Sequence, residues 1–236
     1  MAIYSDRGVV LRRLEYSESS QIVVLFTGRH GKIRAIAKGV RRNTKKRFAA
    51  GIDLLEIGTV TFSARGPRPK ALATLTEWKQ TRLPSGLRAS LSRLYAAMYL
   101  AEITTALTED WDPHEDVFEA LIDTIATLAQ SDEPLPAVVR YQGALLCGIG
   151  SMPRLDACVH CSTDEGLAYF SAHDGGLICD ACAQPRPERR RVSEETLQVL
   201  RSGSWSARPT GVFRLLDYDI AHMMGHEPRL SKKLMG

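Results

Sequence analysis

Residues 28–38 read GRHGKIRAIAK, and this stretch decides the fold class of the N-terminal part of the chain. Its polar, glycine-rich start predicts a tight turn, and the alternation that follows predicts a strand. Because side chains alternate across a strand, one face is expected to be apolar and the other cationic. The apolar face holds Ile33, Ala35 and Ala37. The cationic face holds Lys32, Arg34, Ile36 and Lys38.

Four further strands are expected close to this one. Runs rich in Val, Leu and Ile or in other strand-forming residues occupy residues 8–14, 21–27, 51–62 and 71–78. Polar turn segments separate them. Five short strands with no helical period among them favour a small closed barrel such as the oligonucleotide-binding (OB) fold. We place this barrel at residues 1–82.

A helical period replaces the strand pattern from residue 85 onward. Apolar residues three and four apart predict a helix of roughly 20 residues, and they are Leu87, Leu91, Leu94, Met98 and Ala101. Asp112 is expected to be the N-cap of the next helix, with Pro113 in its first position. Further helices are expected at 137–146, from a Ser193 cap to about residue 201, and at 210–224, closed by Gly225.

The fold class that follows is α+β, with four segments. The OB barrel at 1–82 precedes a first helical part at 83–150. A zinc-ribbon-like cysteine module at 151–190 is inserted before a C-terminal helical part at 191–236.

Four of the five cysteines form two CxxC pairs that are separated by 17 residues. The pairs are Cys158 with Cys161 and Cys179 with Cys182. Two such pairs supply the tetrahedral four-sulfur shell that Zn²⁺ prefers in structural sites, so one structural zinc ion per chain is predicted. Four sulfur ligands leave no position for water, and the site is therefore expected to be non-catalytic.

Redox activity is the alternative role for these pairs. A redox CxxC is typical of a strand-to-helix junction, which we expect for neither pair. Cys147 is expected to be buried on an apolar helix face. His160 and His173 are expected to take no part in metal binding.

Charge is distributed unequally along the chain. Residues 1–82 carry 17 Lys and Arg against 6 Asp and Glu, whereas residues 83–150 carry 3 against 10. A basic segment of this kind favours a polyanion partner, because Lys and Arg release the counterions condensed on phosphates. A solvated basic surface that only aids solubility is the alternative.

Two runs hold most of the candidate phosphate ligands. The first follows the cationic strand and contains Lys38, Arg41, Arg42, Lys45, Lys46 and Arg47. The second follows the last cysteine pair and contains Arg189, Arg190 and Arg191. Phe26, Phe48 and Trp78 are candidates for stacking on bases, although core packing is the commoner role for each.

Several functions are disfavoured by what the sequence lacks. It has no apolar run long enough to span a bilayer and no apolar leader at residues 1–7, so a cytoplasmic protein is expected. Phosphate-loop, dinucleotide, zinc-protease and serine-hydrolase motifs are absent, so no enzyme activity is predicted.

The N-terminal motifs resemble those of the RecO family of recombination mediators. The resemblance runs through residues 8–13, 16–20, 25–31 and 35–42. It continues through 74–77 and the four cysteines to 224–228. It implies a nucleoid-associated protein that binds single- and double-stranded DNA and anneals complementary strands. It also implies partnership with RecR and single-strand-binding protein, and help in loading RecA during gap repair.

Two other functions stay open at this point. A zinc-ribbon RNA-binding or translation factor would share the barrel and the basic loop. A metal-dependent nuclease would need the acidic residues of 109–119 to hold Mg²⁺, although their position near helix ends fits capping better.

Overall fold

The computed structural model describes residues 2–40, 48, 52–66, 71–82, 84–184 and 188–235. The chain divides into two compact units, residues 1–130 and 131–236, and each is described by itself. The helices that end by residue 128 group with the barrel, and the helix that starts at Leu135 groups with the cysteine module. The four-segment division expected from the sequence remains a prediction.

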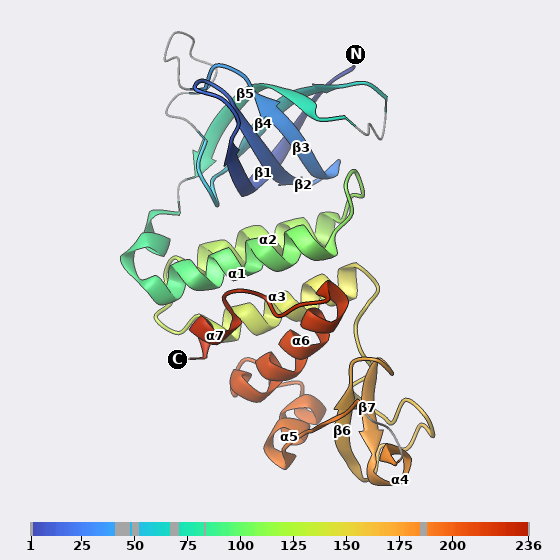
Figure 1. The fold of residues 1–236 in the computed structure, drawn as a ribbon. Coiled ribbons are helices and arrows are strands. Elements are labelled where there is room, and N and C mark those ends of the chain that lie inside the picture. Colours follow the sequence, from blue (N-terminus) through green and yellow to red (C-terminus); the bar gives the residue numbers. More distant parts are fainter. Residues whose placement is uncertain are drawn as a thin grey trace. The chain divides into compact units, whose positions relative to one another are not determined.

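The first unit holds five strands followed by three helices (Figure 1). They are β1 (Ala2–Glu15), β2 (Gln21–Thr27), β3 (Gly31–Ala37), β4 (Ile57–Ala64), β5 (Ala73–Arg82), the 3-10 helix η1 (Ser85–Ala89), α1 (Leu91–Leu107) and α2 (Glu115–Leu128).

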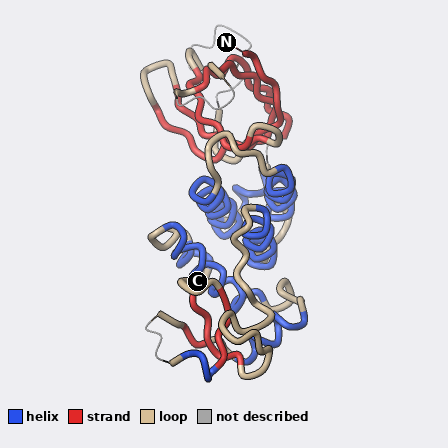
Figure 2. The backbone as a smooth tube through the Cα atoms, turned by 90° about the vertical axis from the view of Figure 1, so that its right-hand side faces the viewer, coloured by secondary structure: helices blue, strands red, loops and turns tan. Residues whose placement is uncertain are grey.

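The strands close into a barrel in the order β1-β2-β3-β5-β4, as the ring of strands in Figure 2 shows. Strands β3 and β5 are parallel, and the other neighbours are antiparallel. The expected barrel and the α+β class are confirmed. Strand β4 starts later than expected because the chain turns at Leu55, whose φ is 64° and whose N–H donates to the carbonyl of Val10.

The alternation in β3 sorts side chains as the sequence predicts. Ile33, Ala35 and Ala37 are buried in the barrel interior. The opposite face of the sheet is partly covered, because α1 packs on β1 and α2 packs on β2. The Phe26 ring on β2 lies 6.1 Å from the ring of Phe118 on α2.

Helix α2 begins at Glu115, so the expected cap at Asp112 with Pro113 in the first turn is wrong. The preceding residues are held against β3 instead, since the Trp111 N–H donates to the Lys32 carbonyl over 2.8 Å. Gly31 permits this approach: its φ is 66°, and a Cβ there would lie 2.0 Å from the Asp112 carbonyl oxygen.

The second unit contains helices and a three-stranded sheet of order β7-β6-β8. Its elements are α3 (Leu135–Gly148), β6 (Leu167–Ser171), β7 (Gly176–Cys179), α4 (Asp180–Ala183), β8 (Arg190–Arg191), α5 (Glu194–Ser202), α6 (Pro209–Met224) and α7 (Ser231–Leu234).

Two predicted helix ends in this unit are confirmed. The Ser193 hydroxyl caps α5 by accepting the Thr196 N–H over 3.2 Å. Gly225 closes α6 with a φ of 73°. Helix α6 packs on α3 and α5. None of the described helices has the length and apolar character that a membrane span requires.

Candidate metal centre and nucleic-acid interface

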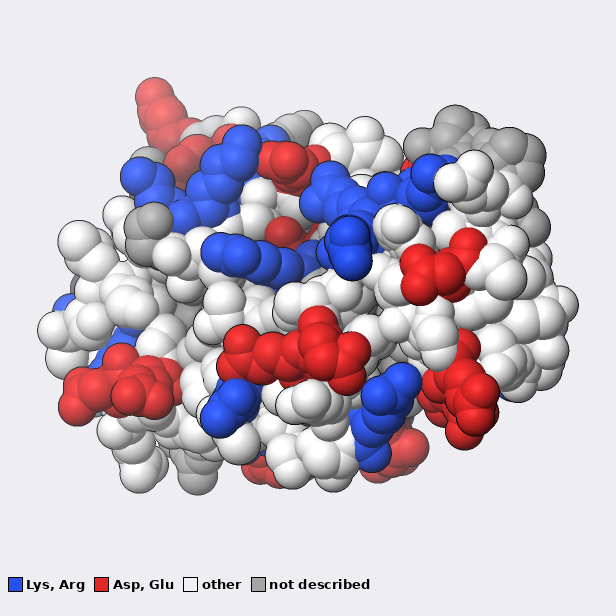
Figure 3. All heavy atoms as spheres, turned by 90° about the horizontal axis from the view of Figure 1, so that it is seen from below, with Lys and Arg blue, Asp and Glu red and all other residues white. Residues whose placement is uncertain are grey.

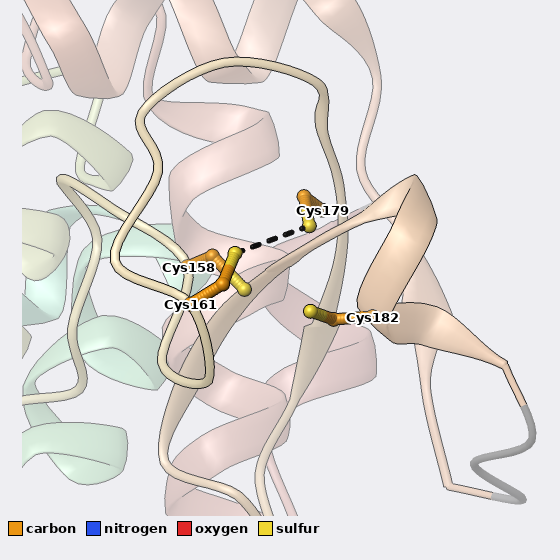
Figure 4. A group of neighbouring side chains, drawn as sticks. All are labelled: Cys158, Cys161, Cys179 and Cys182. Carbon is orange, nitrogen blue, oxygen red and sulfur yellow. Dashed lines mark hydrogen bonds between the residues drawn. The ribbon is translucent and has the colours of Figure 1, made fainter.

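Four cysteine sulfur atoms converge in the second unit (Figure 4). The Sγ atoms of Cys158, Cys161, Cys179 and Cys182 all lie within 4.8 Å of one another, and those of Cys161 and Cys179 are 3.6 Å apart. Four sulfurs around a tetrahedral Zn²⁺, each at about 2.3 Å, would be roughly 3.8 Å apart. The thiols therefore fit a metal ion of this size.

Local backbone geometry brings the two pairs together. The first pair lies in a tight turn, in which the Ser162 N–H donates to the Cys158 carbonyl over 2.9 Å. A left-handed backbone at Ser162, with φ of 61°, closes this turn. Cys179 ends β7, and Cys182 lies in α4 directly after it. The Val159 N–H donates to the Leu177 carbonyl over 2.9 Å, which ties the turn to β7.

The electrostatics of the cluster favour a thiolate at Cys158. Burial alone raises the pKa of its thiol, but the backbone N–H groups of Cys179, Cys161 and His160 outweigh burial and lower the pKa to about 6. Hydrogen bonds to the sulfurs of Cys161 and Cys179 raise the pKa of Cys182 to about 12. The cluster thus holds at least one thiolate at neutral pH, the form that binds metal.

Two expectations about cysteines need correction. The second pair does lie at a strand-to-helix junction, β7 to α4. Convergence of all four sulfurs still favours a shared metal ion over two separate redox pairs. Cys147 is exposed, because it follows the last buried residue of α3, Leu146, and turns to the solvent side.

The histidines near the cluster have other partners. His160 Nε2 lies 3.4 Å from a carboxylate oxygen of Asp174. The ring of His173 lies 6.4 Å from that of His222. Among the described residues, the four cysteines are the group of Cys, His, Asp and Glu side chains close enough to share an ion.

Lys32 on β3 is engaged by the helices of the first unit. Its ammonium donates to the carbonyl oxygens of Thr105 and Thr108 at the C-terminal end of α1, at 2.6 and 2.5 Å, and lies 3.6 Å from Asp110. Burial lowers the pKa of Lys32, and Asp110 opposes this effect. The side chain is 11% exposed, so Lys32 complements the negative end of α1 and offers little to an outside ligand.

The other predicted cations of the barrel differ in whether a carboxylate pairs with them. Arg34 is exposed but pairs with Asp110, which accepts from its Nε at 2.7 Å. Lys38 is exposed and has no carboxylate partner among the described residues. The predicted cations of the basic loop lie outside the described residues, and they are Arg41, Arg42, Lys45, Lys46 and Arg47.

None of the three aromatic residues proposed for base stacking is exposed enough to stack on a base. Phe26, Phe48 and Trp78 are 0%, 8% and 3% exposed. Phe48 and Trp78 belong to the barrel core, and Phe26 is covered by α2. The Trp78 indole N–H donates to buried Glu56 over 3.0 Å. Core packing is therefore the role of all three.

The predicted arginine run of the second unit borders a cavity of about 690 Å³. Arg190 and Arg191 from β8 line it, together with Arg208 and Arg214 at the start of α6. Arg208 pairs with Glu195 at 2.9 Å. Within the described chain, Arg191 and Arg214 have no carboxylate partner. We call the cavity that these four arginines line the arginine cavity. Figure 3, seen from below Figure 1, shows that Lys and Arg side chains gather across part of this face, with clusters of Asp and Glu beside them.

A tyrosine and a glutamate hold this cavity in shape. The Arg190 guanidinium lies 3.6 Å from the centre of the Tyr218 ring, within cation–π range. The Tyr218 hydroxyl donates to Glu188, which also accepts from the Ser171 hydroxyl of β6 at 2.6 Å. Strand β8 pairs with β6, so the arginines extend the sheet that carries Cys179. Arg189 lies instead over Tyr169.

Comparison with known proteins covers most of the chain. Residues 1–83 match the family described as Recombination protein O N terminal, and residues 88–202 match Recombination protein O C terminal. The chain belongs to the RecO family.

Similar RecO-family proteins come from diverse bacteria. The chain is 34% identical over 196 residues to the DNA repair protein RecO of Anaeromyxobacter sp. (strain K), covering 82% of this chain and 76% of that one. It is 30% identical over 194 residues to that of Bacillus subtilis (strain 168), covering 82% and 74%. It is 32% identical over 197 residues to that of Rhodopirellula baltica, covering 82% and 72%.

Three residues of this RecO-family chain escaped the sequence reasoning. Arg208 and Arg214 are isolated cations in the sequence, and only the packing of α6 against the cysteine module brings them to Arg191. Tyr16 is 64% exposed in the turn between β1 and β2. Its position directly after an alternating strand was the available signal, because side chains at hairpin tips are solvated.

Proposed function

We propose that this chain is a non-enzymatic DNA repair mediator. It binds single- and double-stranded DNA, anneals complementary strands and helps to load RecA onto DNA coated with single-strand-binding protein. RecR and single-strand-binding protein are its proposed protein partners. Family membership supports a role in DNA repair, and the finer steps are what the RecO resemblance implies.

The observation that carries this proposal is that each unit of the chain exposes cations that have no carboxylate partner among the described residues. In the first unit these include Arg12 and Lys38, and in the second Arg191 and Arg214. Annealing holds two polyanions close together, and this costs repulsion unless cations compensate it. We infer that two sets of cations meet that requirement: the barrel and its basic loop hold one strand, and the run from Arg189 to Arg191, with its neighbours, contacts the other.

Two of the acidic residues that a nuclease would need, Asp110 and Glu119, form ion pairs with cations of the barrel. Asp110 pairs with Lys32 and Arg34. Glu119 pairs with Arg7 at 2.6 Å. These ion pairs fix the helices to the barrel, which supports a binding function over metal-assisted hydrolysis.

Zinc is the metal we propose for the four-cysteine site, with one ion per chain. Four thiolates are the ligand set of structural zinc sites, and zinc has no redox chemistry of its own. When bound, the ion supplies cross-linking only: it joins the turn at Cys158 and Cys161 to the junction of β7 and α4.

An annealing assay with two complementary oligonucleotides tests the proposal. We expect the protein to accelerate duplex formation, both with bare strands and with strands coated by single-strand-binding protein. Failure to anneal together with tighter binding to structured RNA would favour the RNA-binding alternative. Cleavage of DNA in Mg²⁺ would contradict the non-enzymatic role.

The basic loop provides a second test. Reversing the charges at Arg41, Arg42, Lys45 and Lys46 is expected to weaken single-stranded and duplex DNA about equally, because phosphate contacts carry no base information. Loss for one sequence alone would contradict this expectation.

A further inference from the structure

A serine hydroxyl group lies on the wall of the arginine cavity. Ser193 lines the cavity between β8 and α5, and it is exposed. Its backbone is extended, with φ of −71° and ψ of 150°, and it follows β8, which is an edge strand of the three-stranded sheet. The chain therefore presents a hydroxyl group at the end of an extended edge segment, two residues after Arg191 and three after Arg190.

The charges that face this hydroxyl group are mostly positive. Four arginines line the cavity against one carboxylate, Glu195, so three positive charges of the lining are uncompensated. Glu195 pairs with Arg208, whereas Arg191 and Arg214 have no carboxylate partner within the described residues. Arginine clusters bind phosphoryl groups, because each guanidinium presents a fork of donors to the phosphate oxygens. The cavity therefore suits a phosphoryl group carried by its own wall.

We propose that Ser193 is a phosphorylation site whose phosphoryl group occupies the arginine cavity and blocks its contacts with DNA. The partner is a protein kinase with an acidic substrate groove, because carboxylates in such a groove pair with Arg190 and Arg191 before the acceptor hydroxyl group. In the transfer, the Ser193 Oγ attacks the γ-phosphorus of ATP, the bond from that phosphorus to its bridging oxygen breaks, and ADP leaves. The hydroxyl proton passes to a base of the kinase. Only the block of DNA contacts rests on the proposed function.

Two threonines also line the cavity, and both are poorer acceptors for such a kinase. Thr196 is only 8% exposed, so its hydroxyl group is out of reach. Thr210 lies in the first turn of α6, where the helical backbone does not fit a groove that binds an extended segment. Ser193 combines exposure, an extended backbone and two preceding arginines.

The modification is compatible with the local fold. The Ser193 hydroxyl caps α5 by accepting the Thr196 N–H, and phosphoryl oxygens are stronger acceptors for the same group. The two carboxylates that follow Ser193 are already paired, Glu194 with Arg201 at 3.7 Å and Glu195 with Arg208 at 2.9 Å. A phosphoryl group brings close to two negative charges at pH 7, fewer than the three positive charges that the lining leaves uncompensated.

Phosphoserine genetically encoded in place of Ser193 in the full chain tests where the phosphoryl group lies. Phosphoserine in place of Ser151 is the matched control, since Ser151 is exposed in the same unit and does not line the cavity. Phosphorus NMR across pH should give a lower pKa for the second ionisation of the phosphoryl group at position 193 than at position 151, because nearby guanidinium groups favour the dianion. Arg191→Ala with Arg214→Ala should reduce this difference.

Annealing assays on the same proteins test the block. Phosphoserine at position 193 should slow annealing as much as Arg191→Ala with Arg214→Ala does, and should make its salt slope shallower by about 1.4, since it cancels two contacts of about 0.7 each. Phosphoserine at position 151 should have a much smaller effect. Adding phosphoserine at position 193 to the double arginine variant should slow annealing little further, because the blocked contacts are already absent.

Incubation with ATP and a serine kinase that selects arginine two and three residues before its acceptor tests the modification itself. Mass spectrometry of the digested protein should place the phosphoryl group on Ser193. Ser193→Asn is the control: Asn caps a helix about as well as Ser, but it has no hydroxyl group to modify. This variant should gain no phosphoryl group at that position and should anneal like the unmodified wild type.

The outcomes separate this inference from the proposed function. A folded chain that gains no phosphoryl group at Ser193 overturns the modification site. Equal pKa values at positions 193 and 151 overturn the placement in the cavity, whether or not the protein anneals DNA. Annealing that phosphoserine at position 193 leaves unchanged, although Arg191→Ala with Arg214→Ala slows it, overturns the block. An unmodified protein that does not anneal overturns the proposed function and the block with it, but neither the modification site nor its place in the cavity.

Discussion

Removal of Arg191 and Arg214 isolates the contribution of the arginine cavity to annealing. Neither guanidinium has a carboxylate partner in the described chain, so each is free to neutralise one phosphate. Binding of a single strand by the barrel should stay nearly intact in the double alanine variant. Annealing should slow, because the second strand loses its contacts.

The size of this effect follows from counterion release. Each phosphate contact with a single strand contributes about 0.7 to the slope of log affinity against log salt. Two lost contacts should make the salt dependence of the annealing rate shallower by about 1.4. Raising the salt from about 50 to about 200 mM would then slow annealing by the variant roughly sevenfold less than annealing by the wild type.

The assay follows annealing of two fluorescently labelled strands by stopped flow across this salt range. Arg140→Ala with Arg201→Ala is the matched control, since it removes the same charge from exposed side chains of the same unit outside the cavity. Equal slowing by control and test variants would refute a localised second site. An unchanged annealing rate in the test variant would leave the barrel and its loop as the sufficient surface.

Two further predictions concern stability. Cys179→Ser should abolish the binding of about one zinc per chain and lower the melting temperature, while DNA binding by the barrel persists. Cys147→Ser is the control and should change neither the zinc content nor the melting temperature. A zinc-free wild type of full stability would contradict this prediction. Gly31→Ala should cost more than the roughly 1–2 kcal/mol of a left-handed backbone, because its Cβ would also displace Asp112. Gly39→Ala has the same backbone penalty with nothing within 4 Å, so equal melting temperatures for the two variants would disprove the clash.

The local sequence pattern was sufficient to predict the barrel and the metal ligands. The alternation of Ile33, Ala35 and Ala37 reports burial directly, because a strand has a period of two. The two CxxC pairs predict a metal site, because each spacing brings two sulfurs to one side of the backbone. Neither inference needs information about distant parts of the chain.

What the sequence left hidden depends on contacts between distant segments. Lys32 is part of a cationic pattern, but the end of α1, more than 70 residues later, engages its ammonium. Phe26 has the position of a surface aromatic on β2, and α2 covers it. Arg214 has no neighbouring cation in the sequence, and it shares a cavity with Arg190 and Arg191 only because α6 packs beside β8. A pattern shows which face a side chain takes but not what later covers that face.

The last prediction concerns Asp219, a buried carboxyl group on α6 near the arginine cavity. Burial, and then repulsion from Glu188, raise the pKa of Asp219 to about 6, compared with about 3.9 in an unfolded chain. Because the folded pKa is the higher one, the stabilising contribution is fully present below pH 4 and is lost as the pH rises through 6. A shift of about two units corresponds to roughly 2–3 kcal/mol of lost stability at pH 7.

Asp219→Asn removes this titration. From pH 4 to pH 7, the unfolding free energy of this variant should therefore rise relative to that of the wild type, as measured by urea unfolding at each pH. Asp156→Asn, whose carboxylate is 82% exposed, is the control and should follow the wild type. Curves for Asp219→Asn that run parallel to the wild type would show that the carboxyl group is not perturbed. The expected divergence has a structural consequence, since Glu188, the source of the repulsion, also accepts from Tyr218 and Ser171. A carboxylate that destabilises the fold at neutral pH therefore lies near Glu188, the residue that joins the metal module to the arginine cavity. Ionisation of Asp219 should therefore also weaken the hydrogen bonds that Glu188 accepts.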